Sequence, residues 1–389
     1  MENVQKNINI FKWYYFFWRF KPLATLAVVY YIGVADSYTA AMGVLAFFSI
    51  IYAAAKIPSG IISDNFGRRK TILFAHFFML SAFLLQALAG QWHLTVLLYV
   101  FAILFGVSEA LLSGTTDALM YETAEEMKKN GDFKTIYSGS MFFDQFGCAL
   151  GALAAMFVTY NISLQALAWI SIIPVFVQSV IAFLFVEPNI KIKRQHPTVS
   201  DFKTVLYAFV INKRLRYFSV TDIFFSTLGD VSHRFESAYF KTFSTEWIMS
   251  LARVFKHCFG MLGFAIVPKI KKYSMCKIYF GSIVLNLIVR SVAVILNNAV
   301  VPFVHMFINF GYATASTAKT DILQKEFMPQ YRATTNSLVL FVKAIFMSLT
   351  TCVLGIIADK FNIYTAMIFL VLLRILGLLI AYLLRGKVK

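Results

Sequence analysis

Residues 60–70 read GIISDNFGRRK. They cover the end of one apolar run, 42–62, and the polar residues that join it to a second run, 71–90. Each run has the roughly 20 residues that an α-helix needs to cross the hydrocarbon core of a bilayer. The stretch combines one aspartate with a glycine and three consecutive cations. A tight, positively charged turn between two membrane-length runs is typical of a cytoplasmic loop in a protein with several spans.

The composition of the whole chain also favours a membrane protein. Of its 389 residues, 59% are hydrophobic and 14% are charged, and the mean hydropathy is +0.70. A soluble globular domain usually carries about 25% charged residues. The 41 Phe and 19 Tyr residues fit a large lipid-facing surface with aromatic side chains at its interfaces. We therefore expect an all-α integral membrane protein in direct contact with the lipid bilayer.

Twelve apolar runs along the chain are long enough to be candidate spans. The first and the seventh are the least clean, because polar residues interrupt them. No small-residue cleavage site follows the first run, so we expect it to stay in the membrane as the first span. The runs are 13–34, 42–62, 71–90, 94–118, 136–159, 164–186, 217–233, 246–268, 277–297, 300–319, 335–357 and 363–384.

Lysine and arginine are concentrated in alternate loops and in both tails, whereas the intervening loops are nearly free of positive charge. Because cytoplasmic loops are enriched in these residues, both termini are predicted to be cytoplasmic, with an even number of spans. The net charge of +17 is therefore a topology signal. Since the cations follow no single groove or arm, nucleic acid is not an expected partner.

The polar, basic connection 187–216 divides the chain into two halves of six spans, 1–186 and 217–389. A short interfacial helix is expected within it, around 202–210. The halves also share a pattern: the fourth span ends with TDALMYE at 116–122, and the tenth ends with TDILQKE 204 residues later (320 − 116), at 320–326. Recurrence at equivalent helix ends indicates a duplication, and hence two pseudo-symmetric bundles.

Three residues of the stretch 60–70 suit the end of one helix and the start of the next. Gly60 would let a neighbouring helix approach closely. Asp64 ends the second span, where its carboxylate can face the positive N-terminus of the eleventh span. Gly67 suits a tight turn that needs a positive φ.

The cations that follow have two candidate partners. Arg68 and Arg69 can reach the carboxylates of Asp117 and Glu122 at the end of the fourth span. Such a cluster would hold the cytoplasmic side shut while the other side is open. Val267 stands where the second half would place a counterpart of Asp64. The charged contacts that hold the cytoplasmic side shut should therefore differ between the two halves. The alternative is ordinary positive-inside charge that caps two helices.

The stretch 60–70 closely resembles the signature loop of the major facilitator superfamily, which has glycine, then aspartate, then glycine followed by two basic residues. The neighbouring IPS at 57–59 and the SGTTD at 113–117 resemble a bacterial branch of that superfamily described as efflux pumps, as do 332–334 and 355–359. The resemblance covers the whole chain and implies twelve transmembrane helices in two pseudo-symmetric six-helix bundles. It further implies a central cavity lined by spans one, two, four, five, seven, eight, ten and eleven.

Ionisable side chains inside membrane helices are costly and are therefore functional candidates. Glu109 and Asp144 are the most central acidic residues of the first half. An apolar cavity favours a protonated carboxyl group, as a proton-coupling site requires. The structural alternative is a buried ion pair of either carboxylate with Lys56 or Lys343. The candidates in the cavity-lining spans are Lys56, Glu109, Asp144, Asp222, Asp230, Arg253, Lys256, Lys319 and Lys343.

Two further arginines, Arg290 and Arg374, fall in the ninth and twelfth spans, which are peripheral by the resemblance. We expect ion pairing or snorkelling toward the interface for both. The mixed signs of the cavity candidates leave a cationic and an anionic substrate equally open. In the fifth span Gly139, Gly147 and Gly151 resemble a glycine-rich antiporter motif, although with different spacing and with alanine in place of its proline.

The other sequence signals exclude most alternatives. The chain has no phosphate-binding loop, no nucleophile elbow and no metal-ligand spacing among its six histidines and four cysteines, so an enzyme, a cofactor and a metal site are not expected. We therefore predict a secondary active transporter for a small organic solute, monomeric, in the bacterial inner membrane, with proton-coupled efflux favoured. The alternatives are a metabolite uptake permease and a receptor or assembly protein that kept the fold without transporting.

Overall fold

The computed structural model describes residues 2–127, 132–188, 199–266, 274–326 and 332–385. Within these ranges the chain is helical apart from caps and short turns, and no strand occurs in them. The chain forms two compact units, Met1–Gln195 and His196–Lys389, here called the N-terminal and the C-terminal unit. The division lies inside the polar connection 187–216.

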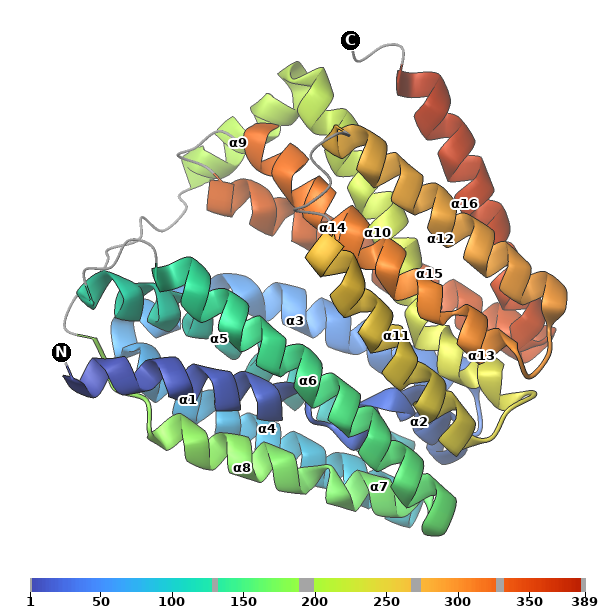
Figure 1. The fold of residues 1–389 in the computed structure, drawn as a ribbon, viewed down its shortest axis with the longest axis horizontal. Coiled ribbons are helices and arrows are strands. Elements are labelled where there is room, and N and C mark those ends of the chain that lie inside the picture. The colour runs from blue at the N-terminus through green and yellow to red at the C-terminus, as the bar shows by residue number, and fades with distance from the viewer. Residues whose placement is uncertain (1, 128–131, 189–198, 267–273, 327–331, 386–389) are drawn as a thin grey trace. The chain divides into compact units, whose positions relative to one another are not determined.

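The N-terminal unit is built from eight α-helices and one 3₁₀ helix in its described residues (Figure 1). Long helices stand where apolar runs of membrane length are predicted. The elements are α1 (Glu2–Arg19), η1 (Pro22–Thr25), α2 (Ala27–Ala35), α3 (Tyr38–Phe66), α4 (Arg68–Trp92), α5 (Thr95–Glu126), α6 (Asp132–Asn161), α7 (Leu164–Ile170) and α8 (Ile172–Phe183).

The first predicted span, 13–34, is not one continuous helix, which corrects that expectation. The helix begins earlier, at Glu2, and is interrupted between Arg19 and Ala27 by the short 3₁₀ turn η1. Pro22 stands at the start of that turn and has no N–H group to continue the α-helical ladder. The backbone of Lys21 is extended, and the N–H of Leu23 is satisfied by the Ser171 hydroxyl instead.

The C-terminal unit follows the same order of long helices with different local breaks (Figure 1). Its first helix, α9, lies in the connection where a short helix is predicted. The elements are α9 (Val199–Ile211), α10 (Lys213–Lys241), α11 (Glu246–Ile266), α12 (Met275–Leu296), α13 (Val301–Val304), α14 (Met306–Glu326), α15 (Arg332–Lys360) and α16 (Ile363–Arg385).

Twelve spans fit this helical order, although not all twelve are equally apolar. Eight helical stretches of the described residues are long and apolar enough to cross a membrane by themselves. The interrupted first helix, α10, α11 and α14 are not among them. These four regions carry many of the charged residues, and charged helix faces need a polar environment inside the protein.

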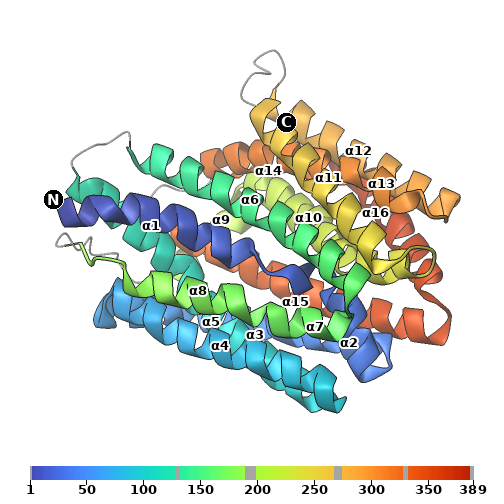
Figure 2. The same ribbon diagram turned by 60° about the horizontal axis from the view of Figure 1, so that its bottom comes forward.

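Helix contacts within the N-terminal unit place α1 beside α6 and α8, and α5 beside α3 and α4 (Figures 1 and 2). Small residues allow two of these approaches. A Cβ atom on Gly147 of α6 would overlap the carbonyl oxygen of Phe16 in α1, and one on Gly106 of α5 would come within 2.9 Å of Ile51 in α3. At Gly60, by contrast, a Cβ would meet no described atom within 4 Å, so the predicted close helix approach is not found there.

Candidate functional site

The turn between α3 and α4 has the conformation that its glycine predicts. Gly67 has a φ of 91°, which a residue with a side chain rarely adopts. Directly after it, the N–H groups of Arg68 and Arg69 donate to the two carboxylate oxygens of Glu187, at 2.7 and 2.8 Å. A carboxylate at a helix N-terminus satisfies free donors and the helix dipole together. Glu187 was not among the predicted site residues, although an acidic residue just after the sixth predicted span was a visible signal.

Arg68 makes a buried ion pair with Glu122 at the end of α5. Its Nη2 lies 2.9 Å from Glu122 Oε1, and the side chains are 7% and 6% exposed. The Ser63 hydroxyl accepts a further bond from Arg68 Nη1 at 2.8 Å. A forked guanidinium with several acceptors fixes the orientation of the helices that carry them. Glu122 is one of the two carboxylates, with Asp117, that were predicted as partners of the loop arginines.

The other members of the predicted loop cluster have different partners. Asp117 accepts a hydrogen bond from the Tyr15 hydroxyl of α1 at 3.3 Å. Arg69 is exposed and donates from Nη2 to the carbonyl oxygen of Phe183 at 2.8 Å. Asp64 lies in the last turn of α3, and its side chain is outside the described residues. The described contacts therefore join helices of the N-terminal unit to one another.

A second polar cluster lies at the break in the first helix. Arg19, the last residue of α1, pairs through Nε with Asp144 Oδ1 of α6 at 2.8 Å. Two residues later, Lys21 Nζ lies 3.7 Å from Glu109 Oε1 of α5, and the indole N–H of Trp18 donates to the same oxygen at 3.1 Å. The two central carboxylates thus face two cations at one interruption of the chain.

This arrangement corrects the ion pairs proposed from the sequence. Glu109 pairs with Lys21 and Asp144 pairs with Arg19, and neither pairs with Lys56 or Lys343. Lys56 of α3 instead donates to the Ser113 hydroxyl of α5, close to the ring of Tyr52. Lys21 was missed because it follows the aromatic run of α1, and only the break places its amine inside the unit.

In the described part of the C-terminal unit, three of the charged pairs between helices each join one cation to one carboxylate away from Glu236. Two of them join candidates that the sequence named separately: Lys319 with Asp222 at 3.1 Å, and Lys343 with Asp230 at 2.7 Å. The third joins the start of α10 to the end of α14 through Arg214 Nε and Glu326 Oε1 at 2.8 Å. Glu326 ends the repeated pattern of the tenth span, as Glu122 ends that of the fourth.

Among the described residues of this unit, the most buried charged group is Glu236 on α10, which was not among the predicted candidates. Its side chain is 1% exposed and contacts Lys256 of α11. His233 Nδ1 lies 3.0 Å from its Oε2, while Arg290 Nη2 and His305 Nδ1 each lie 3.5 Å from its Oε1. We call these residues the Glu236 cluster. Glu236 lies on a helix with many polar residues, and its sequence position alone gives no sign of its partners.

The two peripheral arginines are both inside the C-terminal unit. Arg290 of α12 points to Glu236, so pairing accounts for it. Arg374 of α16 is buried and donates from Nη2 to the Ser232 hydroxyl at 3.4 Å, so snorkelling is wrong for it. On the same helix face as Lys256, Arg253 is half-buried and contacts His233 at 3.4 Å.

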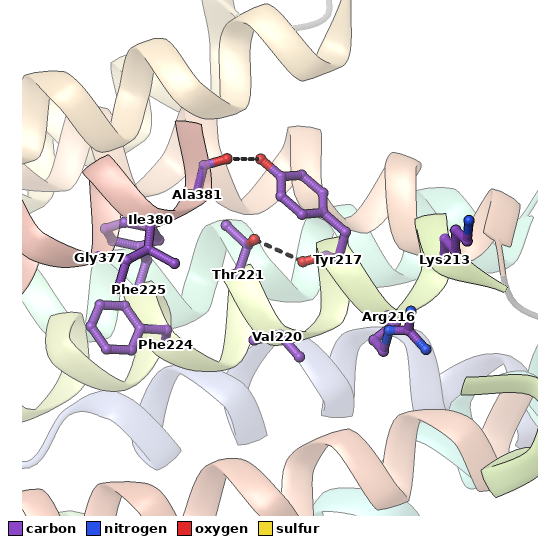
Figure 3. Close-up of a pocket in the computed structure, with 10 residues that line it drawn as sticks. All are labelled: Lys213, Arg216, Tyr217, Val220, Thr221, Phe224, Phe225, Gly377, Ile380 and Ala381. Carbon is purple, nitrogen blue, oxygen red and sulfur yellow. Dashed lines mark hydrogen bonds between the residues drawn. The ribbon is translucent and has the colours of Figure 1, made fainter. Parts of the chain in front are cut away.

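An elongated cavity of about 490 Å³ lies between α10 and α16 (Figure 3). Lys213 and Arg216 lie at one end of it and aromatic and aliphatic side chains at the other. The lining residue of α10 nearest in sequence to Glu236 is Phe225, 11 residues away on the same helix (236 − 225), which is about 16 Å along the helix axis. Its lining is Lys213, Arg216, Tyr217, Val220, Thr221, Phe224, Phe225, Gly377, Ile380 and Ala381.

The described residues hold no group of three or more histidine, cysteine, aspartate or glutamate side chains placed to bind a metal ion. The polar groups of both units are arranged as ion pairs and hydrogen bonds between helices. Such groups can bind a polar solute or a proton and can exchange partners when helices move.

Comparison with solved structures shows a fold shared with transporters. The chain is similar to the nucleoside transporter NupG (13% identity, TM-score 0.77, covering 98% of each chain) and to a POT family transporter in complex with 5-aminolevulinic acid (12%, 0.79, 99% of this chain and 97% of that one). It is also similar to a D-xylose-proton symporter (14%, 0.71, 97% of each chain). At these identities the likeness concerns the fold.

No curated protein matches the sequence closely enough to count as a relative. The sequence profile of the Major Facilitator Superfamily, however, matches residues 14–387. The match covers both units and includes the loop that joins α3 to α4. The chain therefore belongs to the Major Facilitator Superfamily and is a membrane transporter, not an enzyme.

Proposed function

We propose that the chain is a proton-coupled secondary active transporter that exports a small organic solute by alternating access. The observation that carries this proposal is the interrupted first helix, where Arg19 pairs with the buried carboxylate of Asp144 and Lys21 pairs with the partly buried carboxylate of Glu109. Discontinuous membrane helices commonly form the solute and ion sites of secondary transporters, because their free backbone ends and side chains bind charge within the membrane.

The two ion pairs supply a means of coupling. Protonation of Asp144 or Glu109 removes the negative charge that its cation neutralises, and the pair separates. The released cation, at the end of α1 or in the extended segment after it, is then free to bind another anion or to follow a movement of the helix. A proton bound in one conformation and lost in the other ties the proton gradient to the helix rearrangement.

Export is the direction that the loop favours. The stretch 60–70 and the end of α5 resemble the corresponding parts of efflux proteins, and glycines of α6 pack against α1 at the break. Solute would leave as protons enter. Uptake together with protons is the second candidate, and the fold shared with a D-xylose-proton symporter favours it.

The membrane, topology and assembly follow the same proposal. In this proposal the protein lies in the inner membrane of a bacterial cell with both termini in the cytoplasm. The reason is that lysine and arginine are concentrated in both tails and in alternate loops, and such basic segments usually stay on the cytoplasmic side. A single chain carries two units with six predicted spans each, so a monomer supplies both parts that alternating access requires.

Proton coupling is tested in proteoliposomes that contain a trapped pH-sensitive dye. Addition of a solute that stabilises the purified protein should move protons in the wild type. Glu109→Gln and Asp144→Asn should abolish this signal while they keep solute binding, measured as a rise in Tm. If both variants move protons as the wild type does, the two carboxylates are not the coupling site.

Direction is tested with the same solute in membrane vesicles of both orientations. An exporter accumulates solute in everted vesicles whose interior is acidic, and an importer accumulates it in right-side-out vesicles with acid outside. Accumulation only in the right-side-out preparation would replace export by uptake and would leave proton coupling in place.

The loop has a separate test. We expect Asp64→Asn to slow transport strongly while membrane insertion and yield are preserved, because this carboxylate is proposed to hold a helix end during closure. Glu125→Gln, which removes a carboxylate near the end of α5, is the matched control. Normal transport by the Asp64 variant would exclude a gating role for that residue.

A further inference from the structure

The Glu236 cluster holds more positive than negative charge. Lys256 and Arg290 both contact Glu236, and Arg374 is bonded to Ser232, one turn earlier on the same helix. All three cationic side chains are buried. These three cations and one carboxylate leave an excess of two positive charges among the four side chains (3 − 1). Buried charge of one sign is costly unless an opposite charge binds beside it.

Two buried arginines, Arg290 in the Glu236 cluster and Arg374 beside it, also have unused donors. Within the described residues Arg290 Nε and Nη1 and Arg374 Nε have no hydrogen-bond partner, although both side chains are buried. His305 Nε2 also has no hydrogen-bond partner among the described residues, whereas its Nδ1 lies 3.5 Å from Glu236 Oε1. Buried donors are nearly always satisfied in proteins, so donors left over around a carboxylate indicate that a second acceptor would be bound favourably there.

One side of the cluster reaches the surface of the unit. His233 is 52% exposed, and its Nδ1 lies 3.0 Å from Glu236 and 3.2 Å from Lys256 Nζ. Arg253, one turn before Lys256 on α11, contacts the same nitrogen from the half-buried side. Basic side chains thus continue from the surface at His233 to the buried guanidinium of Arg290, which gives an anion a path of favourable potential.

From these observations we propose that the transported solute carries an anionic group, a carboxylate or a phosphate, and that this group binds at Lys256 and Arg290 in the Glu236 cluster. The inference rests on the proposed transport function and names the substrate class. It also resolves the choice between a cationic and an anionic solute that the mixed charges of the sequence leave open.

Glu236 then acts as an internal competitor. Its carboxylate is the anion that contacts Lys256 and Arg290 in the structure. An incoming anion must share these cations with it or displace it. Removing the charge of Glu236 should therefore strengthen anion binding, whereas a purely structural ion pair would only become less stable.

The test measures the Tm of the purified full-length protein with three probes of similar shape: benzoate, benzamide and benzylammonium. We expect benzoate alone to raise the Tm, in proportion to the logarithm of its concentration above Kd. Arg290→Gln and Lys256→Gln should weaken benzoate binding by about tenfold or more, because each removes a charge-assisted hydrogen bond. Glu236→Gln should instead bind benzoate more tightly than the wild type does.

The control is Lys241→Gln. Lys241 lies on α10, like Glu236, but its amine pairs with Glu246 outside the cluster. This variant should bind benzoate as the wild type does. The inference is overturned if benzamide or benzylammonium stabilises equally, if no probe does, or if the benzoate shift survives in the Arg290 and Lys256 variants.

Sodium chloride and inorganic phosphate at matched ionic strength complete the experiment. An equal shift with chloride would assign the site to an inorganic anion and overturn the substrate class. Transport of an uncharged solute in proteoliposomes would overturn it as well, while the proposed function would stand.

Discussion

The two units differ in how their charged groups are combined. In the N-terminal unit three cations each pair with one carboxylate: Arg19 with Asp144, Lys21 with Glu109, and Arg68 with Glu122. The C-terminal unit has single pairs as well, but in addition Lys256, Arg290 and two histidines converge on one carboxylate, that of Glu236. Charges that are matched one to one are suited to switching by protons, because a proton breaks one pair. An excess of one sign is suited to binding a solute of the other sign.

The ends of the repeated patterns show a second difference. Glu122 is buried against Arg68, whereas Glu326 pairs with Arg214, whose side chain is 56% exposed. The same sequence pattern therefore ends in a dry contact in one unit and in a partly solvated one in the other. Exposed ion pairs contribute little to stability, whereas buried ones are costly to break. The same substitution should therefore destabilise the protein more at Glu122 than at Glu326.

The largest expected effect is on the Glu236 cluster. Glu236→Gln leaves the cations around it without their carboxylate, and we expect a loss of about 3–5 kcal/mol in the free energy of unfolding, as for other broken buried pairs. Size-exclusion chromatography and the Tm in detergent measure it, and benzoate should restore part of the loss. A variant as stable as the wild type would show that the cluster is solvated and that the two units do not differ as described.

A smaller net effect is expected where partners are matched. Arg68→Met and Glu122→Gln should each destabilise by about 3 kcal/mol, because each leaves a buried charge alone. The double variant should cost clearly less than their sum, since both charges are gone. The equivalent cycle on Arg214 and Glu326 should give a coupling below about 1 kcal/mol. Equal coupling energies in the two cycles would contradict the difference in burial.

The smallest effect is expected at the start of α4. Glu187→Gln keeps an acceptor but removes the negative charge at the helix N-terminus, which is worth about 0.5–1 kcal/mol. Hydrogen exchange at the amides of Arg68 and Arg69 should become faster, while the Glu125→Gln control leaves it unchanged. Unaltered exchange at these amides would mean that the turn at Gly67 holds the helix start without the carboxylate.

Much of the fold could be predicted from the sequence, because membrane helices are recognised by the length and hydropathy of their apolar runs. The apolar runs, the positive φ of Gly67 and the contact between Arg68 and Glu122 all follow from local patterns. The break in the first helix was missed, although Pro22 was a visible signal, because the aromatic and aliphatic residues around it continue the apolar run without a gap.

By itself the sequence determined the class of protein, the helical order and the family, since these depend on the period and length of apolar segments and on one short loop. Only the tertiary structure decided which charges meet. Glu236 and Arg290 are 54 residues apart (290 − 236), and Arg19 and Asp144 are 125 apart (144 − 19). Electrostatic pairing depends on distance in space, which helix packing sets, and a hydropathy pattern records only whether a charge is present.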